Sequence, residues 1–167
     1  NPMAAPFPYP ALGPTHAGNW IAHPNDETAS VGRGEAIARA ADTPVILLNA
    51  PLTAARLGYG ELSGLDLLEL FAFVHPARFA VPTAAGMARA LDMQPPESDA
   101  MAAAFLREAA EVLLARLESD WPEREGAWDS AQALLRAKWL WAGPVLERLA
   151  KPLKPERWLF SRLPEWE

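Results

Sequence analysis

The sequence predicts an α/β (α+β) fold, in which a small mixed sheet of about three strands with an N-terminal hairpin is followed by about five helices. Three observations lead to this prediction. Two short apolar segments flank a polar turn, an unbroken apolar run follows them, and the rest of the chain is rich in alanine, with apolar residues at helical spacing. The length of 167 residues suits one domain with a core of its own.

The N-terminal end combines a proline-rich segment with a hairpin pattern. Residues 1–15 contain five prolines, so we expect an extended, poorly ordered lead-in before a single domain at 16–167. Residues 18–22 and 28–31 flank a Pro-Asn-Asp-Glu turn, which is typical of a β-hairpin with a four- or five-residue loop.

A short helix and a buried strand are expected next. Residues 35–41 suit the helix, which an Asp-Thr-Pro segment ends. Residues 45–48 are Val-Ile-Leu-Leu, and an unbroken apolar run of this kind is typical of a central strand covered on both faces. The Asn-Ala-Pro segment that follows is expected to end the strand.

The remainder is expected to be helical. Ser63 is a good N-cap for a helix over residues 65–74, which is apolar nearly all round and therefore deeply packed, with Asp66 as a helix-dipole partner. Further helices are expected from Thr83 to Leu91, from Ser98 or Asp99 to about Glu118, from Pro122 to a break at Gly143-Pro144, from Val145 to Ala150, and from Glu156.

Charge is unevenly placed along the chain. Residues 94–129 hold nine acidic and three basic side chains, whereas residues 130–163 hold seven basic and two acidic ones, interleaved with aromatic rings. Because arginine and aromatic groups together can hold a phosphate backbone and stack on bases, this part is a candidate DNA contact. The candidate residues are Arg136, Lys138, Arg148, Lys151, Arg157 and Trp158. The alternative is a packed core beneath a solvated basic face, which the net charge of −6 favours.

Several classes of site lack their residues in this sequence. Cysteine is absent, so disulfides, thiolate nucleophiles and thiolate metal sites are excluded. Residues 32–34, Gly-Arg-Gly, have neither the spacing nor the lysine of a phosphate-binding loop, and the three histidines match no metal-ligand spacing. With no apolar run of about 20 residues and no visible secretion signal, a cytoplasmic location is expected.

One part of the chain resembles the middle of DnaQ-type 3′–5′ exonuclease domains. The resemblance rests on residues 65–76, which read Leu-Asp-Leu-Leu-Glu-Leu-Phe-Ala-Phe-Val-His-Pro, and on residues 83–93 after them. Before these, residues 48–53, Leu-Asn-Ala-Pro-Leu-Thr, are similar to the family motif His-Asn-Ala-x-Phe-Asp. The motif histidine then falls on Leu48 and the catalytic aspartate on Thr53.

The other two motifs of that family fall on residues without carboxylates. The Asp-x-Glu-Thr motif of the opening strand is expected near Ala22 and Pro24, and the His and Asp of the third motif near Ala100 and Phe105. The resemblance therefore implies a degenerate RNase H-like fold with no catalytic, metal-binding or cofactor-binding residues in this chain.

From about His16 to Glu167 the chain resembles the N-terminal region of DinG-like ATP-dependent DNA helicases of alphaproteobacteria, most clearly over residues 32–51, 66–79 and 157–167. The resemblance implies a longer protein whose motor uses ATP and Mg²⁺ and, in many relatives, carries an iron–sulfur cluster. Partners implied are the motor domains of the same chain and single-stranded DNA, with no membrane.

The expected function is a non-catalytic accessory domain that positions single-stranded DNA or docks on the motor. Two alternatives remain open. One is a metal-dependent 3′–5′ exonuclease that uses the displaced acids Asp26, Glu27, Asp66 and Asp99. The other is a protein–protein adaptor without DNA contact, which would lack the steep salt dependence of DNA binding.

Overall fold

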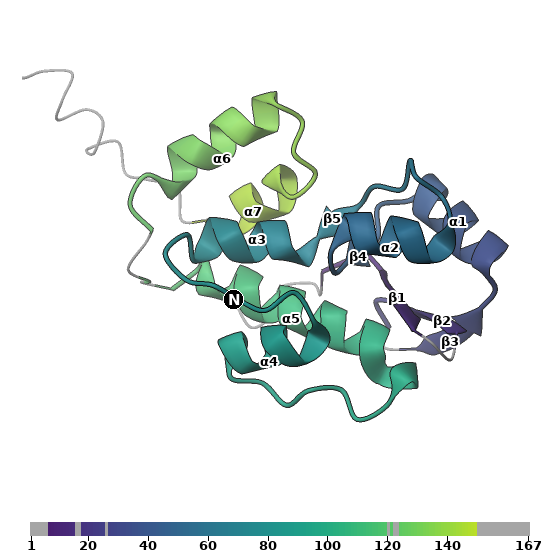
Figure 1. The fold of residues 1–167 in the computed structure, drawn as a ribbon. Helices are drawn as coiled ribbons and strands as arrows, with labels where there is room; N and C mark the ends of the chain where they lie inside the picture. Colours follow the sequence, from purple (N-terminus) through teal and green to yellow (C-terminus); the bar gives the residue numbers. More distant parts are fainter. Residues whose placement is uncertain (1–6, 16–17, 26, 120, 122–123, 150–167) are drawn as a thin grey trace, which may run out of the picture.

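A computed structural model describes residues 7–15, 18–25, 27–119, 121 and 124–149. These residues form a mixed α/β structure in which a five-stranded sheet precedes most of the helices (Figure 1). In chain order the elements are β1 (Ala11–Thr15), β2 (Gly18–Ala22), β3 (Thr28–Val31), α1 (Arg33–Asp42), β4 (Ile46–Leu47), α2 (Ala50–Leu57), β5 (Leu65–Asp66), α3 (Leu67–Val74), α4 (Ala84–Leu91), the short 3-10 helix η1 (Asp99–Met101), α5 (Ala102–Arg116), α6 (Ala127–Arg136) and α7 (Ala142–Arg148).

The sheet has the strand order β3-β2-β1-β4-β5. The first three strands pair antiparallel, whereas β4 pairs parallel with β1 and β5 pairs parallel with β4. The expected hairpin is confirmed, since β2 and β3 pair with Trp20 opposite Ser30 and Ala22 opposite Thr28. The expected strand in residues 45–48 is confirmed as the shorter β4.

The expected count of about three strands is wrong, because β1 and β5 were not anticipated. Residues 11–15, assigned to the lead-in, instead form β1 at the centre of the sheet. Only two consecutive residues of β1, Ala11 and Leu12, are apolar, and prolines stand on both sides of them. β5 contains only two residues, too few to show a strand pattern.

The helices also differ from expectation in number and in their first residues. Seven α-helices lie in the described part of the chain, and α2 begins where the Asn-Ala-Pro segment was expected only to end a strand. Helix α3 is capped by Asp66 and not by Ser63, because residues 65–66 pair with β4. Helix α7 contains Gly143-Pro144 in its first turn, where a proline needs no backbone donor. The expected Thr83 cap of α4 is confirmed.

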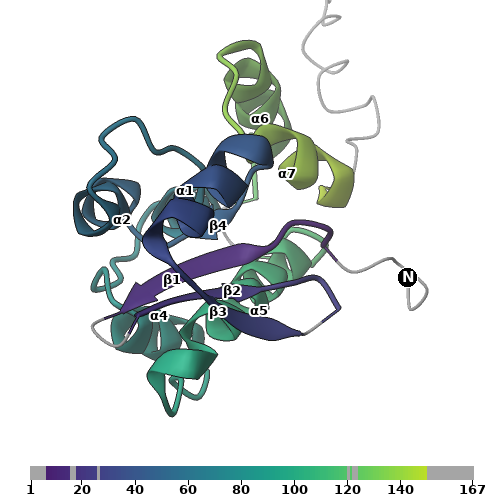
Figure 2. The same cartoon turned by 90° about the vertical axis from the view of Figure 1, so that its right-hand side faces the viewer.

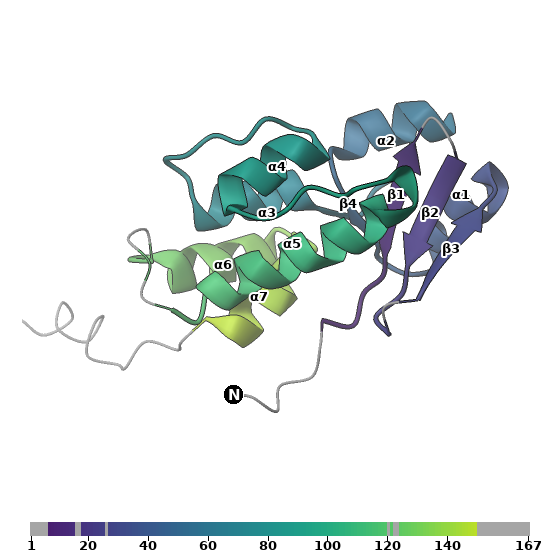
Figure 3. The same ribbon diagram turned by 90° about the horizontal axis from the view of Figure 1, so that it is seen from below.

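The sheet lies between two layers of helices (Figures 2 and 3). Successive residues of a strand point to opposite faces. Ala11 and Ile46 therefore join the larger core, with α3, α4, α5 and α7, whereas Leu12 and Leu47 join a smaller core beneath α1 and α2. No helix in the described ranges is long and apolar enough to cross a bilayer.

Candidate functional site

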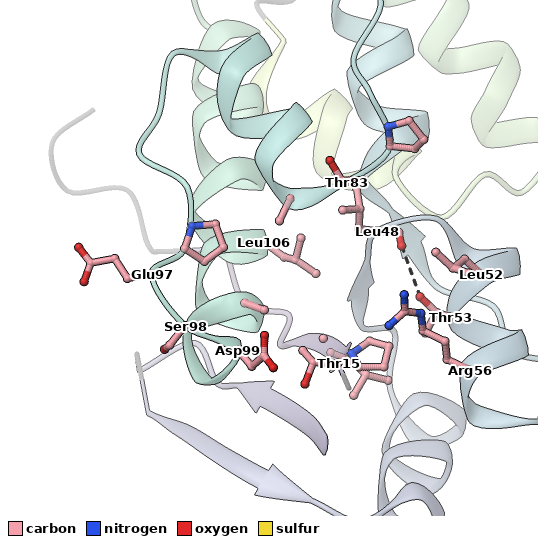
Figure 4. A pocket seen from close by; sticks show the side chains of 17 residues that line it. Thr15, Leu48, Leu52, Thr53, Arg56, Thr83, Glu97, Ser98, Asp99 and Leu106 are labelled. Carbon is pink, nitrogen blue, oxygen red and sulfur yellow. Dashed lines mark hydrogen bonds between the residues drawn. The ribbon is translucent and has the colours of Figure 1, made fainter. Parts of the chain in front are cut away.

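A cavity of about 430 Å³ opens where β1 and β4 end, and we call it the strand-end cavity (Figure 4). Its walls come from the end of β1, from Leu48 and α2, from the start of α4, from residues 96–99 and from the first turns of α5. This volume lies in the range of small-molecule sites, and the carboxyl ends of parallel strands are the usual place for a site in an α/β fold.

The β1 wall presents Gly13 and Thr15, which share one face of the strand because they are two residues apart. A Cβ added at Gly13 would lie 3.2 Å from the backbone nitrogen of Ala103 and 3.4 Å from Cβ of Ala102. Helix α5 is thus packed so closely on Gly13 that a larger side chain has little room there. The Thr15 hydroxyl donates a hydrogen bond to the Gly18 carbonyl at 2.8 Å.

The α2 wall depends on a buried carboxylate. Asp66 is 5% exposed and accepts hydrogen bonds from the backbone nitrogens of Asn49 at 3.0 Å, Ala50 at 2.7 Å and Leu68 at 3.0 Å. One side chain therefore holds the first turn of α2 to the start of α3. Asn49 adopts a left-handed φ of 67°, and its Oδ1 accepts from the Leu52 nitrogen.

Helix α2 then carries the cavity-facing residues Thr53, after its first turn, and Arg56, in its last turn. Thr53 is 2% exposed, and its hydroxyl donates to the Leu48 carbonyl at 3.4 Å. The Arg56 guanidinium reaches toward the cavity beside Thr53, Asp99 faces the cavity from the opposite wall, and Glu97 points away (Figure 4). Within the described residues Arg56 has no hydrogen-bond or ion-pair partner. One wall of the cavity is therefore positive and the other negative.

The residues matched to exonuclease motifs in the sequence lie in different parts of the structure. Ala22, expected near the first motif, pairs with Ala11 at the end of β1 farthest from the cavity. In the first strand of the chain, β1, Gly13 and Thr15 line the cavity. Thr53, matched to the second motif, lines the same cavity, but Phe105 of the third region is buried in the core and does not line it.

The three displaced acids that the structure describes, Glu27, Asp66 and Asp99, do not converge. Asp66 is occupied by three backbone donors, Glu27 lies in the β2–β3 turn, and Asp99 lies at the strand-end cavity. Asp26 lies outside the described residues. Over the ranges that the structure describes, no group of three or more histidine and carboxylate side chains is arranged to hold a metal ion.

Three of the six C-terminal DNA candidates lie in or next to α6 and α7 and do not line this cavity. Arg136 ends α6, and Lys138 follows it with a φ of 68°; both side chains are exposed. The Arg148 guanidinium is paired with Glu118 at 3.2 Å and with Glu111 at 3.3 Å, so two carboxylates offset its charge. Lys151, Arg157 and Trp158 lie outside the described residues.

A separate polar cluster lies between α3, α4 and α5. The Arg116 guanidinium contacts Nε2 of the buried His75 at 2.7 Å. Burial, and to a lesser extent the positive charge of Arg78, lowers the pKa of Arg116 from its usual value. Because arginine only donates, Nε2 of His75 accepts here, which is the arrangement of a neutral imidazole. The cluster is part of the helix packing and lies apart from the strand-end cavity.

Sequence reasoning did not single out Gly13, Thr15 or Arg56. The first two lie in the unanticipated strand β1, and Arg56 is a lone arginine in the unanticipated helix α2. Neither the Gly-Pro-Thr segment at residues 13–15 nor the lone arginine matches a motif, so the sequence held no signal for these residues. Comparisons of this chain with family models, curated proteins and solved structures found no match.

Proposed function

We propose that this chain is a non-catalytic, RNase H-like module that binds single-stranded DNA at the strand-end cavity, as an accessory domain of a longer DinG-like helicase. The observation that carries the proposal is the residue set at the ends of β1 and β4. Gly13, Thr15 and Thr53 line the cavity, and the proposal takes them as the positions that correspond to the carboxylates of the exonuclease motifs. The strand order β3-β2-β1-β4-β5, with three antiparallel and two parallel strands, supports the related fold.

The chemistry of the cavity favours binding over hydrolysis. Two-metal cleavage of a phosphodiester needs several carboxylates around two cations about 4 Å apart. The cavity is lined by the hydroxyls of Thr15, Thr53, Thr83 and Ser98, by the Arg56 guanidinium and by Asp99, while Glu97 points outward (Figure 4). The hydroxyls of Thr15 and Thr53 already donate to backbone carbonyls, so the Arg56 guanidinium is the group placed to donate to phosphate oxygens. One inward-facing carboxylate, Asp99, is too few for a two-metal site.

The proposal predicts DNA binding without degradation. The purified chain is mixed with a 3′-labelled single strand in the presence of Mn²⁺, and both the bound fraction and the length of the strand are followed. We expect a salt-sensitive complex and a strand of unchanged length, with or without a chelator. Shortening that a chelator stops would establish the exonuclease alternative, and absence of binding at low salt would favour the adaptor.

Restoring carboxylates tests the geometry of the cavity directly. In the double variant Thr15→Glu/Thr53→Asp, the two new carboxylates and Asp99 line one cavity, so we expect it to gain a divalent-cation site there. At Mn²⁺ tenfold above the Kd, binding to the native state adds about 1.4 kcal/mol, which raises the Tm by about 3–6 °C.

The matched control for this gain is Thr15→Gln/Thr53→Asn, which has similar shapes without the charges. Its Tm should respond to Mn²⁺ no more than that of the natural chain. Gly13 is left unchanged because α5 leaves little room there. If the double variant does not fold, Thr15→Glu alone gives a smaller shift in the same direction, and equal responses in the acid and amide variants would contradict the proposed geometry.

A further inference from the structure

We propose that a single strand bound at the strand-end cavity leaves it over the last turn of α2 and the first turn of α1, with its phosphates on Arg56 and Arg33. This inference rests on the proposed function and adds the path and the residues that hold the backbone. It replaces the C-terminal basic residues as the main phosphate contacts.

Arg56 is placed to receive the first phosphate outside the cavity. It lies in the last turn of α2 and lines the cavity, with its guanidinium beside Thr53 (Figure 4). The side chain is exposed and has no partner in the described parts of the chain. Its five donors are therefore available, and a planar guanidinium can bind two phosphate oxygens at once.

Arg33 extends the positive surface away from the cavity. It is the first residue of α1, just after the end of β3. The last residue of β3, Val31, pairs with Asn19, and the neighbouring residue Gly18 pairs with Thr15 at the cavity end of β1. Arg33 thus lies at the same end of the sheet as the cavity. Its Nη1 would be 3.4 Å from a Cβ added at Gly58, the residue that ends α2. The two arginines therefore flank the last turn of α2, and Arg33 also has no partner among the described residues.

The surrounding charges favour this route. The acid nearest to Arg33 in sequence, Glu35, is already paired with Arg39 at 3.1 Å. Asp99 and Glu97 lie on the opposite wall of the cavity, so they repel a phosphate backbone from that side. On α7, by contrast, Arg148 is offset by Glu118 and Glu111. A purely structural role remains the competing explanation, because cations near the end of a helix stabilise its dipole.

The salt dependence of binding separates these explanations. Binding of the chain to a fluorescent oligothymidylate is measured by anisotropy at several salt concentrations. For Arg33→Gln/Arg56→Gln, loss of two phosphate contacts should reduce the log–log salt slope by about 1.4 and weaken binding by about 25-fold at 0.1 M salt, if the affinity at 1 M salt is unchanged. A structural role alone would lower the Tm and leave the slope unchanged.

Two control variants complete the test. Arg136→Gln/Lys138→Gln removes the same charge from the end of α6 and should leave the slope nearly unchanged, and Arg33→Lys/Arg56→Lys should keep the slope of the natural chain. If the glutamine pair does not fold, Arg56→Gln alone should lower the slope by about 0.7. An unchanged slope in the glutamine variants, or loss of binding only in the α6 variant, overturns the path while the proposed function stands. Absence of binding by the natural chain overturns the proposed function itself.

Discussion

Replacing Asp66 by alanine is expected to lower the free energy of unfolding by about 3–5 kcal/mol, because it leaves three backbone donors in a buried region without their acceptor. The carboxylate serves the Asn49, Ala50 and Leu68 nitrogens from a site that is 5% exposed. Urea denaturation followed by tryptophan fluorescence measures the loss as a lower transition midpoint.

Two variants show whether the effect comes from this hydrogen-bond set. Asp66→Asn keeps one acceptor oxygen but turns an NH₂ group toward a backbone donor, so its loss should be intermediate. Glu69→Ala removes an exposed carboxylate from the first turn of α3, together with the hydrogen bond that it accepts from the Trp139 indole. This variant should lower the free energy of unfolding by no more than about 1.5 kcal/mol. Comparable losses in Asp66→Ala and Glu69→Ala would contradict the assigned role.

Thr83 and Asp66 both cap helices, but only the cap made by Thr83 could be predicted from the sequence. Thr83 directly precedes α4, and its hydroxyl accepts from the Gly86 nitrogen only three residues along the chain. The local pattern was therefore enough to predict the start of α4. Asp66 holds Asn49 and Ala50, which lie 17 and 16 residues away, so α2 depends on a partner that no local pattern can indicate. Without that partner, an Asn-Ala-Pro segment reads as a helix breaker.

The candidate site was predictable only in part, for a similar reason. Thr53 was found because residues 48–53 resemble a family motif. Thr15 was missed because β1 has no apolar alternation of its own. It is a strand because it pairs with β2 and β4. Arg33 and Arg56 carry no motif, and only the fold brings the Arg33 side chain to Gly58, directly after α2.

The same dependence on distant partners predicts a second large effect, at Trp141. Its side chain is fully buried, its indole nitrogen donates to the Asp66 carbonyl at 2.8 Å, and its ring stacks on Phe7 with centroids 5.7 Å apart. Trp141→Ala is therefore expected to cost about 3–5 kcal/mol, through the cavity it creates and the unpaired carbonyl it leaves. Chemical denaturation followed by far-UV circular dichroism measures the loss.

The control Trp141→Phe keeps a ring against Phe7 and loses the hydrogen bond, so it should cost clearly less than the alanine variant. Because Trp141 joins α7 to the β5–α3 junction and to the N-terminal segment, Trp141→Ala should shift one cooperative transition that includes the sheet. An early, separate loss of helical signal, with the sheet unfolding at its original midpoint, would mean that α6 and α7 form an independent unit. In that case the strand-end cavity, built by the sheet with α2, α4 and α5, would keep its shape in the variant.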